Sequence, residues 1–386
     1  MTTRFNGRYD PWHHSYYSKF RPGSSHHASS KQLKICFVLG SADISGGTYV
    51  VLQHAMYALS QGAQVTLATI FGHDRSNQWH PVLQHIDPVD ISTAAASSYD
   101  IVIATWWRTV FDLPKFRSRH FVYFVQSAEN RFYHEPTSLD ASGLAELTYT
   151  LDLPVITIAR WLQLHLAWTY RRPSFVVNNG IRKDLYSPVG PTVEPRPHGH
   201  TRFLVEGPVD VPMKNVQKSI DLLRDGGAKD VWMLTSSDVS SFTGVDRVFS
   251  RVPITSTPSI YRSCDVLVKL SRVEGMYGPP LEMFHCGGTV ITYDVTGHEE
   301  YVVHQQNGLV ADMDDESQVL AYIEQLRDDV ELVSQLKFGA LATASRWPDW
   351  TESSRLFWNY LTAFAELAPY DNGLSLLAAR GASLDL

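Results

Sequence analysis

Two glutamates, Glu274 and Glu282, are separated by seven residues and enclose a segment rich in glycine and proline. Free N–H groups at the start of a helix attract an anion such as a phosphate. A carboxylate beside that anion would repel it, unless the carboxylate bonds sugar hydroxyls instead. The arrangement therefore predicts a site for a nucleotide sugar, which carries both groups. The alternative is a surface glutamate followed by one that favours a first helical turn electrostatically.

The elements around this segment suit such a site. The apolar run at residues 265–270 is typical of a buried strand. Gly275 and Gly278 are expected to let the chain turn sharply after that strand. The two prolines at 279–280 suit the first turn of a helix, and the glycines at 287–288 would end it.

The stretch Glu-Gly-Met-Tyr-Gly-Pro-Pro-Leu-Glu, residues 274–282, resembles the Glu-x7-Glu signature of the retaining glycosyltransferases of family 4, which have the GT-B fold. The family pattern is Glu-Gly-Phe-Gly-x-Pro-x-x-Glu, so the aromatic Tyr277 stands one residue late. The Asn-Gly-Ile turn at residues 179–181 and the Asn-Gly-Leu segment at 307–309 also match the family. The resemblance implies an α/β protein with two Rossmann-like, doubly wound domains that face each other across a cleft.

The resemblance also implies roles for individual residues. Glu274 and Lys214 would be catalytic, with Lys214 neutralising the donor diphosphate. The family usually has a second cation, an Arg, directly after Gly207, but Pro208 or Val209 takes that place here, and Arg272 is the candidate substitute. The residues implied to contact the donor are Glu282, Gly46, Gly47, Tyr277, Gly278, Pro279, Arg272, Thr235, Ile254 and Thr255.

On the acceptor side, Trp106 and Trp107 end the predicted strand 100–105, where they can form a platform for a sugar ring or a lipid. Core packing of at least one of them is the alternative. Together with the segment 123–126 they resemble the subset of family 4 that builds rhamnose-containing bacterial polysaccharides. Gln126 stands where many members have His, and the acceptor site is completed by Arg131. A basic stretch, residues 108–120, would suit an anionic lipid carrier or a phosphorylated acceptor, or is a solvated face.

Strands and helices alternate in both halves of the chain, which predicts two doubly wound α/β domains. The expected organisation is an N-terminal tail (1–30), an acceptor-side domain (31–185), a proline-rich linker (186–200), a donor-binding domain (201–345), a helix returning to the first domain (346–368) and a tail (369–386). The first turn, residues 40–47, lacks the Gly-x-Gly-x-x-Gly dinucleotide fingerprint. It is expected to face the donor phosphates or to need a positive φ.

Composition narrows the function classes. The chain has 386 residues, 44% hydrophobic and 19% charged, with a net charge of −7, which does not favour a nucleic-acid partner. Its three cysteines indicate buried thiols in a reducing compartment, and no apolar run reaches the length of a membrane span. We expect a cytoplasmic enzyme, with peripheral contact at the inner membrane face as a further option. Oligomeric state is left open.

Two weaker metal signals are present. The histidine pairs at 13–14 and 26–27 lie in the N-terminal tail, and Asp312 and Asp314 form an Asp-x-Asp. A loosely packed tail and a helix cap at Asp315 are the favoured interpretations. We therefore expect no metal.

The expected reaction moves a hexose or deoxyhexose from a UDP-, GDP- or dTDP-sugar to a glycan or lipid-linked acceptor hydroxyl, with retention and without a cofactor. A role in bacterial polysaccharide or glycoconjugate synthesis follows from the same resemblance. The alternatives are a GT-B phosphorylase or epimerase, and a non-catalytic GT-B binding protein in a glycan assembly.

Overall fold

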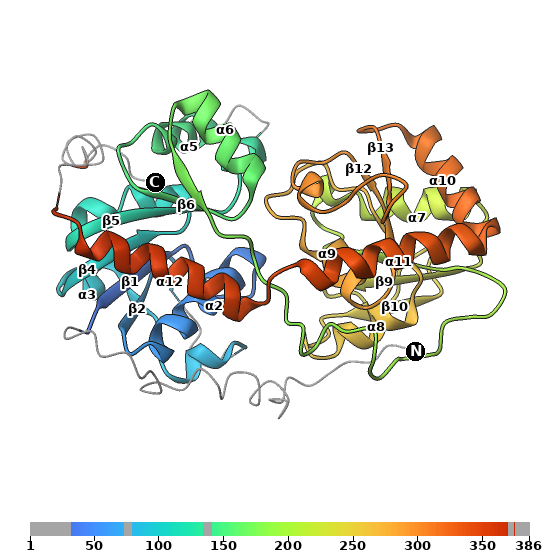
Figure 1. The fold of residues 1–386 in the computed structure, drawn as a ribbon, viewed down its shortest axis with the longest axis horizontal. Helices are drawn as coiled ribbons and strands as arrows, with labels where there is room; N and C mark the ends of the chain where they lie inside the picture. The colour runs from blue at the N-terminus through green and yellow to red at the C-terminus, as the bar shows by residue number, and fades with distance from the viewer. Residues whose placement is uncertain (1–31, 73–78, 134–140, 370–373, 375–386) are drawn as a thin grey trace. The chain divides into compact units, whose positions relative to one another are not determined.

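The computed structural model describes residues 32–72, 79–133, 141–369 and Leu374 (Figure 1). The predicted tail 1–30 with its histidine pairs, and nearly all of the tail 369–386, lie outside these residues. The chain divides into two compact units, an N-terminal unit that ends at Gly180 and resumes at Trp350, and a C-terminal unit formed by Ile181–Asp349.

The N-terminal unit is built on a parallel sheet of seven strands in the order β3-β2-β1-β4-β5-β6-β7. The strands are β1 Lys34–Leu39, β2 Gln64–Thr69, β3 Val89–Asp90, β4 Ser98–Ala104, β5 Arg117–Val125, β6 Val155–Thr157 and β7 Ser174–Val176. Helices cover both faces, so central strands such as β1 and β4 are continuous apolar runs.

The helical segments of this unit are α2 Gly46–Ser60, η1 Pro81–Gln84, α3 Ile91–Ala95, α4 Trp107–Val110, η2 Leu113–Lys115, η3 Glu129–Phe132, α5 Ala141–Tyr149, α6 Arg160–Tyr170 and α12 Trp350–Glu366. Helix α12, red in Figure 1, comes from the end of the chain and packs on α2. Its Phe357 stacks on His54 with ring centroids 4.1 Å apart, and Phe357 also meets Phe124 on β5. Burial lowers the pKa of His54 to about 3, so this ring is neutral.

The C-terminal unit has a parallel sheet of six strands in the order β10-β9-β8-β11-β12-β13. The strands are β8 Arg202–Glu206, β9 Asp230–Thr235, β10 Arg247–Ser250, β11 Val266–Lys269, β12 Thr289–Tyr293 and β13 Leu309–Ala311. The helical segments are η4 Pro212–Lys214, α7 Val216–Asp225, α8 Thr257–Ser263, α9 Gly278–His285, η5 His298–Glu300, α10 Glu316–Asp328 and α11 Val330–Arg346. Both units are therefore doubly wound α/β domains, and the predicted fold class is confirmed.

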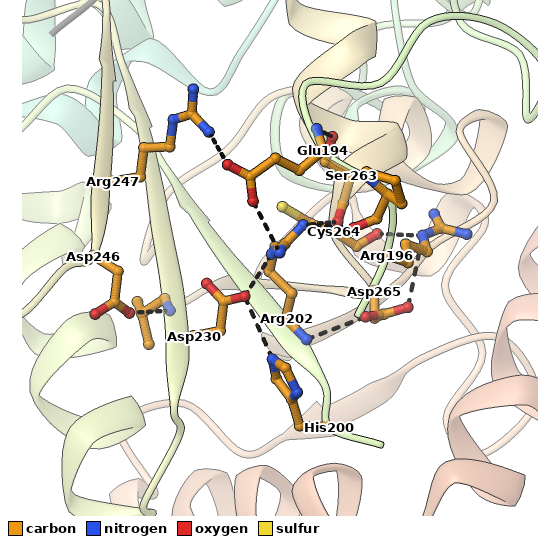
Figure 2. A network of polar contacts seen from close by, with 12 residues as sticks. Glu194, Arg196, His200, Arg202, Asp230, Asp246, Arg247, Ser263, Cys264 and Asp265 are labelled. Atoms are coloured by element: carbon orange, nitrogen blue, oxygen red, sulfur yellow. Dashed lines mark hydrogen bonds and ion pairs between the residues drawn. The ribbon is translucent and has the colours of Figure 1, made fainter. Parts of the chain in front are cut away.

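A network of ion pairs and hydrogen bonds connects the amino ends of the strands in the C-terminal unit (Figure 2). Arg202 is 6% exposed at the start of β8, and its Nε donates to Asp230 Oδ2 at 2.6 Å. The same guanidinium donates to the carbonyls of Pro195 and Ser263 and lies 4.3 Å from the Trp232 ring centroid. These contacts stabilise the amino edge of the sheet. In open α/β sheets ligands bind outside the carboxyl ends of the strands, so a functional site is expected at the opposite edge.

The segment 186–200, predicted as a linker, packs onto the C-terminal unit. The Val193 N–H donates to Ser263 Oγ at 2.9 Å, and Arg196 Nε donates to the carbonyl of Cys264 at 2.9 Å. The three cysteines are buried and free, and burial raises the pKa of Cys36 and Cys286 to about 12. Among the described residues, no helix combines the length and apolarity needed to cross a membrane.

Candidate functional site

The strands β8 and β11 are hydrogen-bonded neighbours, so the loops that follow them leave the sheet side by side. Gly207, directly after β8, has a φ of +149°, a conformation that favours glycine. A Cβ added there would lie 3.5 Å from the Lys214 Cβ and 3.8 Å from the Lys269 Nζ. The bare backbone of Gly207 therefore lies beside two lysines.

Two hydrogen bonds join the loop that carries Lys214 to the loop after β11. Asn215 has a left-handed backbone, and its side-chain Nδ2 donates to the carbonyl of Leu270 at 2.8 Å. The Arg272 N–H donates to the carbonyl of Met213 at 2.9 Å. These bonds hold Lys214 against the turn that contains Glu274.

Lys214 and Glu274 form an ion pair, with 2.7 Å between Nζ and Oε1. The side chains are 22% and 10% exposed, so the pair is largely withdrawn from water. The structure thus brings the two residues predicted as catalytic together. The lysine that is expected to neutralise a diphosphate is therefore already paired with a carboxylate.

A second ion pair lies within this edge and was not foreseen from the sequence. Lys269 Nζ donates to Glu206 Oε2 at 2.6 Å and to the Glu206 carbonyl at 3.1 Å, with only 3% of the lysine side chain exposed. Burial lowers the pKa of Lys269, but Glu206 and Glu274 outweigh it, and the net pKa lies above its usual value. The available signal was a lysine at the end of an otherwise apolar strand.

Glu282, on α9, is close to this pair. Desolvation, followed by the charge of Glu206, raises the pKa of Glu282 to about 8, although hydrogen bonds from Tyr261 and Tyr186 and the charge of Lys269 act in the opposite direction. Its carboxyl group therefore holds a proton more readily than an ordinary glutamate. A protonated carboxyl both donates and accepts hydrogen bonds, which suits vicinal hydroxyls.

The start of α9 has few backbone N–H groups that could donate hydrogen bonds to an anion. The helix begins at Gly278 with prolines in its first turn, as predicted, and Gly287 follows it with a φ of +77°. Pro279 and Pro280 have no N–H, so within residues 278–280 only Gly278 offers a backbone donor. The first turn therefore offers fewer N–H groups to an anion than a helical turn without proline would. Neither Gly275 nor Gly278 has a positive φ.

The Tyr277 side chain is fully buried. Its hydroxyl donates to the Lys269 carbonyl and shares a hydrogen bond with Thr292 Oγ1 at 2.8 Å, while its own carbonyl accepts from Tyr301. These contacts support the turn from below. Because this side chain is buried, a sugar-nucleotide donor could contact Tyr277 only through its backbone.

Arg272, the candidate for the second diphosphate cation, is bound to a carboxylate at the surface. Its Nη2 donates to Asp314 Oδ1 at 2.7 Å and its Nε donates to the same oxygen at 2.9 Å. Asp315 caps α10 by accepting from the Gln318 N–H at 3.0 Å, as predicted. Within the described ranges, no group of three or more His, Cys, Asp or Glu side chains could hold a metal.

The residues expected near the nucleotide base follow β9 and β10. Thr235 is buried, and its Oγ1 accepts from the Ser237 N–H at 3.1 Å. Ile254 and Thr255 are half-buried, and the Ile254 carbonyl accepts from Thr257 Oγ1 at 2.8 Å. Thr235 therefore shapes its loop, and the half-buried pair keeps side-chain surface for a ligand.

In the N-terminal unit, Gly46 and Gly47 form the first residues of α2 rather than a turn with positive φ. Ser45 caps the helix by accepting from the Thr48 N–H at 3.1 Å. A Cβ added at Gly47 would lie 3.6 Å from the amide of Gln126, whereas at Gly46 it would meet nothing within 4 Å. The structure thus brings Gly47 and Gln126 together.

The adjacent tryptophans have different environments. Trp107 is 3% exposed, and its Nε1 donates to the Tyr133 hydroxyl at 3.0 Å. Trp106 is half-buried over Gly40, where an added Cβ would lie 3.1 Å from its ring. Trp107 therefore packs in the core, and Trp106 keeps an open surface. Arg131 is half-buried, with its guanidinium 5.4 Å from the Trp161 ring centroid.

A buried carboxyl group beneath the tryptophans was missed because its residue type carries no distinguishing pattern. Glu129 is 5% exposed and accepts from the Trp107 N–H at 2.8 Å and from the Tyr123 hydroxyl at 3.3 Å. Its own N–H donates to the Tyr149 hydroxyl at 2.8 Å. Burial raises the pKa of Glu129 to about 8, although the hydrogen bonds from the Trp107 N–H and the Tyr123 hydroxyl lower it.

Comparison with known proteins relates these features to a family and a fold. Residues 247–340 match the family model described as glycosyl transferases group 1, a segment that contains Lys269, Glu274 and Glu282. No curated protein matches the sequence.

Solved structures resemble the whole fold. HepE from Anabaena in complex with UDP-glucose is 15% identical, with a TM-score of 0.68 over 86% of this chain and 100% of that chain. Sucrose-phosphate synthase from Thermosynechococcus elongatus is 14% identical, with a TM-score of 0.66 over 87% and 100%. The lipopolysaccharide outer core galactosyltransferase WaaB is 15% identical, with a TM-score of 0.62 over 86% and 99%. The chain therefore has the GT-B fold.

Proposed function

We propose that the protein is a retaining glycosyltransferase that moves a hexose or deoxyhexose from a nucleoside diphosphate sugar to an acceptor hydroxyl. The observation that carries the proposal is the Lys214–Glu274 ion pair at the carboxyl edge of the C-terminal sheet, with Glu274 inside the segment that matches group 1 glycosyl transferases. Because HepE has the same fold and was solved with UDP and with UDP-glucose, UDP-sugars are the first donors to test.

In the proposed reaction, the bond between the anomeric carbon and the diphosphate oxygen breaks while the acceptor oxygen bonds to that carbon on the same face. The acceptor proton passes to the leaving diphosphate. Lys214 would transfer its ion pair from Glu274 to the diphosphate, a charge-assisted contact with a fixed donor. Glu274, released from the lysine, would face the positive charge that develops at the anomeric carbon.

Glu282 would bind the two ribose hydroxyls, donating to one and accepting from the other. The Gly207 backbone would lie close to the diphosphate, because it lies beside Lys214. Lys269 would act through Glu206, because its ammonium is already bound to that carboxylate. No metal is part of this proposal, since the lysine supplies the positive charge.

The experiment combines binding with stereochemistry. UDP, GDP and dTDP are screened for thermal stabilisation, and the sugar nucleotide of the best one is incubated with candidate acceptors while NMR follows the anomeric signal. A donor at 100 times its dissociation constant should add about 2.7 kcal/mol of stability. An anomeric configuration inverted in the product would contradict retention. Undiminished transfer by both Glu274→Gln and Lys214→Ala would contradict the site.

A non-catalytic, sugar-nucleotide-free GT-B protein is the second candidate. It is favoured by the carboxylate partners of Lys214 and Lys269 and by Pro208 where the family has Arg. Calorimetric titration with the three nucleoside diphosphates decides between the two. Absence of binding for all of them supports the second candidate, and binding that Lys214→Ala weakens supports the first.

A further inference from the structure

Arg108 follows β4 at the carboxyl edge of the N-terminal sheet and lies against two aromatic rings. Its guanidinium carbon is 5.3 Å from the Phe71 ring centroid and 5.4 Å from that of Trp106, and the two rings are 6.3 Å apart. Phe71 is 48% exposed, and Trp106 and Arg108 are half-buried. We name this group, Phe71, Trp106 and Arg108, the aromatic–arginine cluster.

The other basic residues of the stretch 108–120 are already engaged. Lys115 pairs with Asp112 at 2.6 Å, Arg119 with Asp100 at 3.6 Å, and Arg117 donates to the carbonyl of Ala96 at 2.6 Å. His120 is buried, and burial together with Arg119 lowers its pKa. Among the described residues, no carboxylate forms an ion pair with Arg108. Arg108 is therefore a cation of this stretch with no carboxylate partner among the described residues, and it is the one that lies against two aromatic rings.

Hydrogen bonds anchor helix α4, which carries Arg108, to the end of β4 and to η3. Thr109 Oγ1 accepts from the N–H groups of Thr105 and Trp106 at 3.0 and 3.2 Å. The Trp107 N–H donates to the buried Glu129 carboxyl at 2.8 Å. Binding of a ligand to Arg108 therefore requires little ordering of this segment, which favours affinity.

The surroundings of the cluster are apolar. Ile44, in the loop after β1, is 68% exposed, and Phe132, after β5, is 38% exposed. Because β2, β1, β4 and β5 are neighbours in the parallel sheet, the loops that follow them share one edge. An edge that combines the Arg108 guanidinium with several exposed apolar side chains matches a molecule with an anionic group and an apolar body, rather than a neutral glycan.

We propose that the aromatic–arginine cluster binds the phosphate group of an amphiphilic acceptor, a phosphate monoester or diester joined to an apolar chain. Arg108 would hold two phosphate oxygens through its parallel N–H groups, and the Phe71 and Trp106 rings would pack against the carbons next to the phosphate. The role as acceptor rests on the proposed glycosyltransferase function, whereas the binding itself does not.

The test compares three soluble probes, namely hexyl phosphate, inorganic phosphate and hexyl glucoside, by calorimetry and by quenching of tryptophan fluorescence. Hexyl phosphate should bind at least tenfold more tightly than either of the others. Arg108→Gln should weaken hexyl phosphate about tenfold or more, since it removes a charge-assisted hydrogen-bonding group. Phe71→Ala should weaken it severalfold. Arg355→Gln, at an exposed arginine of α12 in the same unit, is the matched control and should leave it unchanged.

Each result decides the inference. Equal binding of hexyl phosphate and hexyl glucoside, or full binding by Arg108→Gln, overturns it. Equal binding of hexyl phosphate and inorganic phosphate overturns the amphiphilic part. Circular dichroism and thermal unfolding of Arg108→Gln check that the variant is folded. Loss of hexyl phosphate binding in Arg108→Gln, in a protein that transfers no sugar, contradicts the glycosyltransferase function and the acceptor role and leaves the phosphate-binding site standing.

Discussion

Lys214 and Glu274 form an ion pair with 2.7 Å between Nζ and Oε1, although 59 residues lie between them in the sequence. A diphosphate that binds Lys214 must replace this carboxylate. If Lys214 binds the diphosphate as proposed, the same contact positions the lysine and lowers its affinity for the donor.

Glu274→Gln and Lys214→Met should have opposite effects on UDP binding. The first removes the competing carboxylate, so UDP should bind severalfold more tightly while transfer falls by about 100-fold, since the charge facing the anomeric carbon is lost. Lys214→Met should weaken UDP binding by about tenfold or more. Calorimetry and a transfer assay measure both, with Lys218→Met, at a surface lysine paired with Glu316, as control. Equal weakening of UDP by both variants would disprove the competition.

Removal of Lys269 should strongly destabilise the protein. Lys269→Met leaves the Glu206 carboxylate partly buried without its cation, which costs about 3–5 kcal/mol in comparable pairs. The double variant Lys269→Met with Glu206→Leu should recover most of this loss, because no unpaired charge remains. Urea unfolding of both variants gives the two free energies of unfolding. Losses that add up in the double variant would refute the coupling.

Glu129 should make stability depend on pH. Its pKa of about 8 in the folded protein exceeds the ordinary value of 4.5, so between these values the unfolded chain releases a proton that the folded protein retains. Its contribution is complete below pH 4.5 and decreases as pH rises to 8, by at most about 1.4 kcal/mol per pH unit. Glu129→Gln should remove this slope. Urea unfolding of both proteins from pH 5 to 8 measures it, and parallel curves would falsify the prediction.

Tyr277→Phe should separate support of the turn from donor binding. The hydroxyl is fully buried and bonded to Lys269 and Thr292, so its loss should cost about 1–3 kcal/mol of stability. UDP affinity should stay within about twofold of the original value, because the two lost hydrogen bonds do not involve the proposed ligand. Thermal unfolding and UDP titration of the same preparation provide both numbers. A tenfold loss of UDP affinity at unchanged stability would mean that the hydroxyl contacts the donor.

Much of the fold follows from local patterns. The predicted strands at residues 265–270 and 100–105 and the predicted helix with prolines at 279–280 correspond to β11, β4 and α9. Strands buried on both faces leave a continuous apolar signal, and prolines and glycines mark helix ends, so the alternation of strands and helices predicts two doubly wound domains. The prolines of segment 186–200 do not reveal its contacts, because the bonds from Arg196 to the carbonyls of Cys264 and Cys286 join residues remote in the sequence.

The sequence by itself determined the fold class and the residue types available at the site, because secondary structure and a short motif are encoded locally. Only the tertiary structure decided how these side chains are used. It paired Lys214 with Glu274, placed Lys269 against Glu206, bound Arg272 to Asp314 and left Arg108 between two aromatic rings. The physical reason is that an ion pair or a shifted pKa depends on distance and burial, which the chain acquires only when strands remote in sequence become neighbours in a sheet.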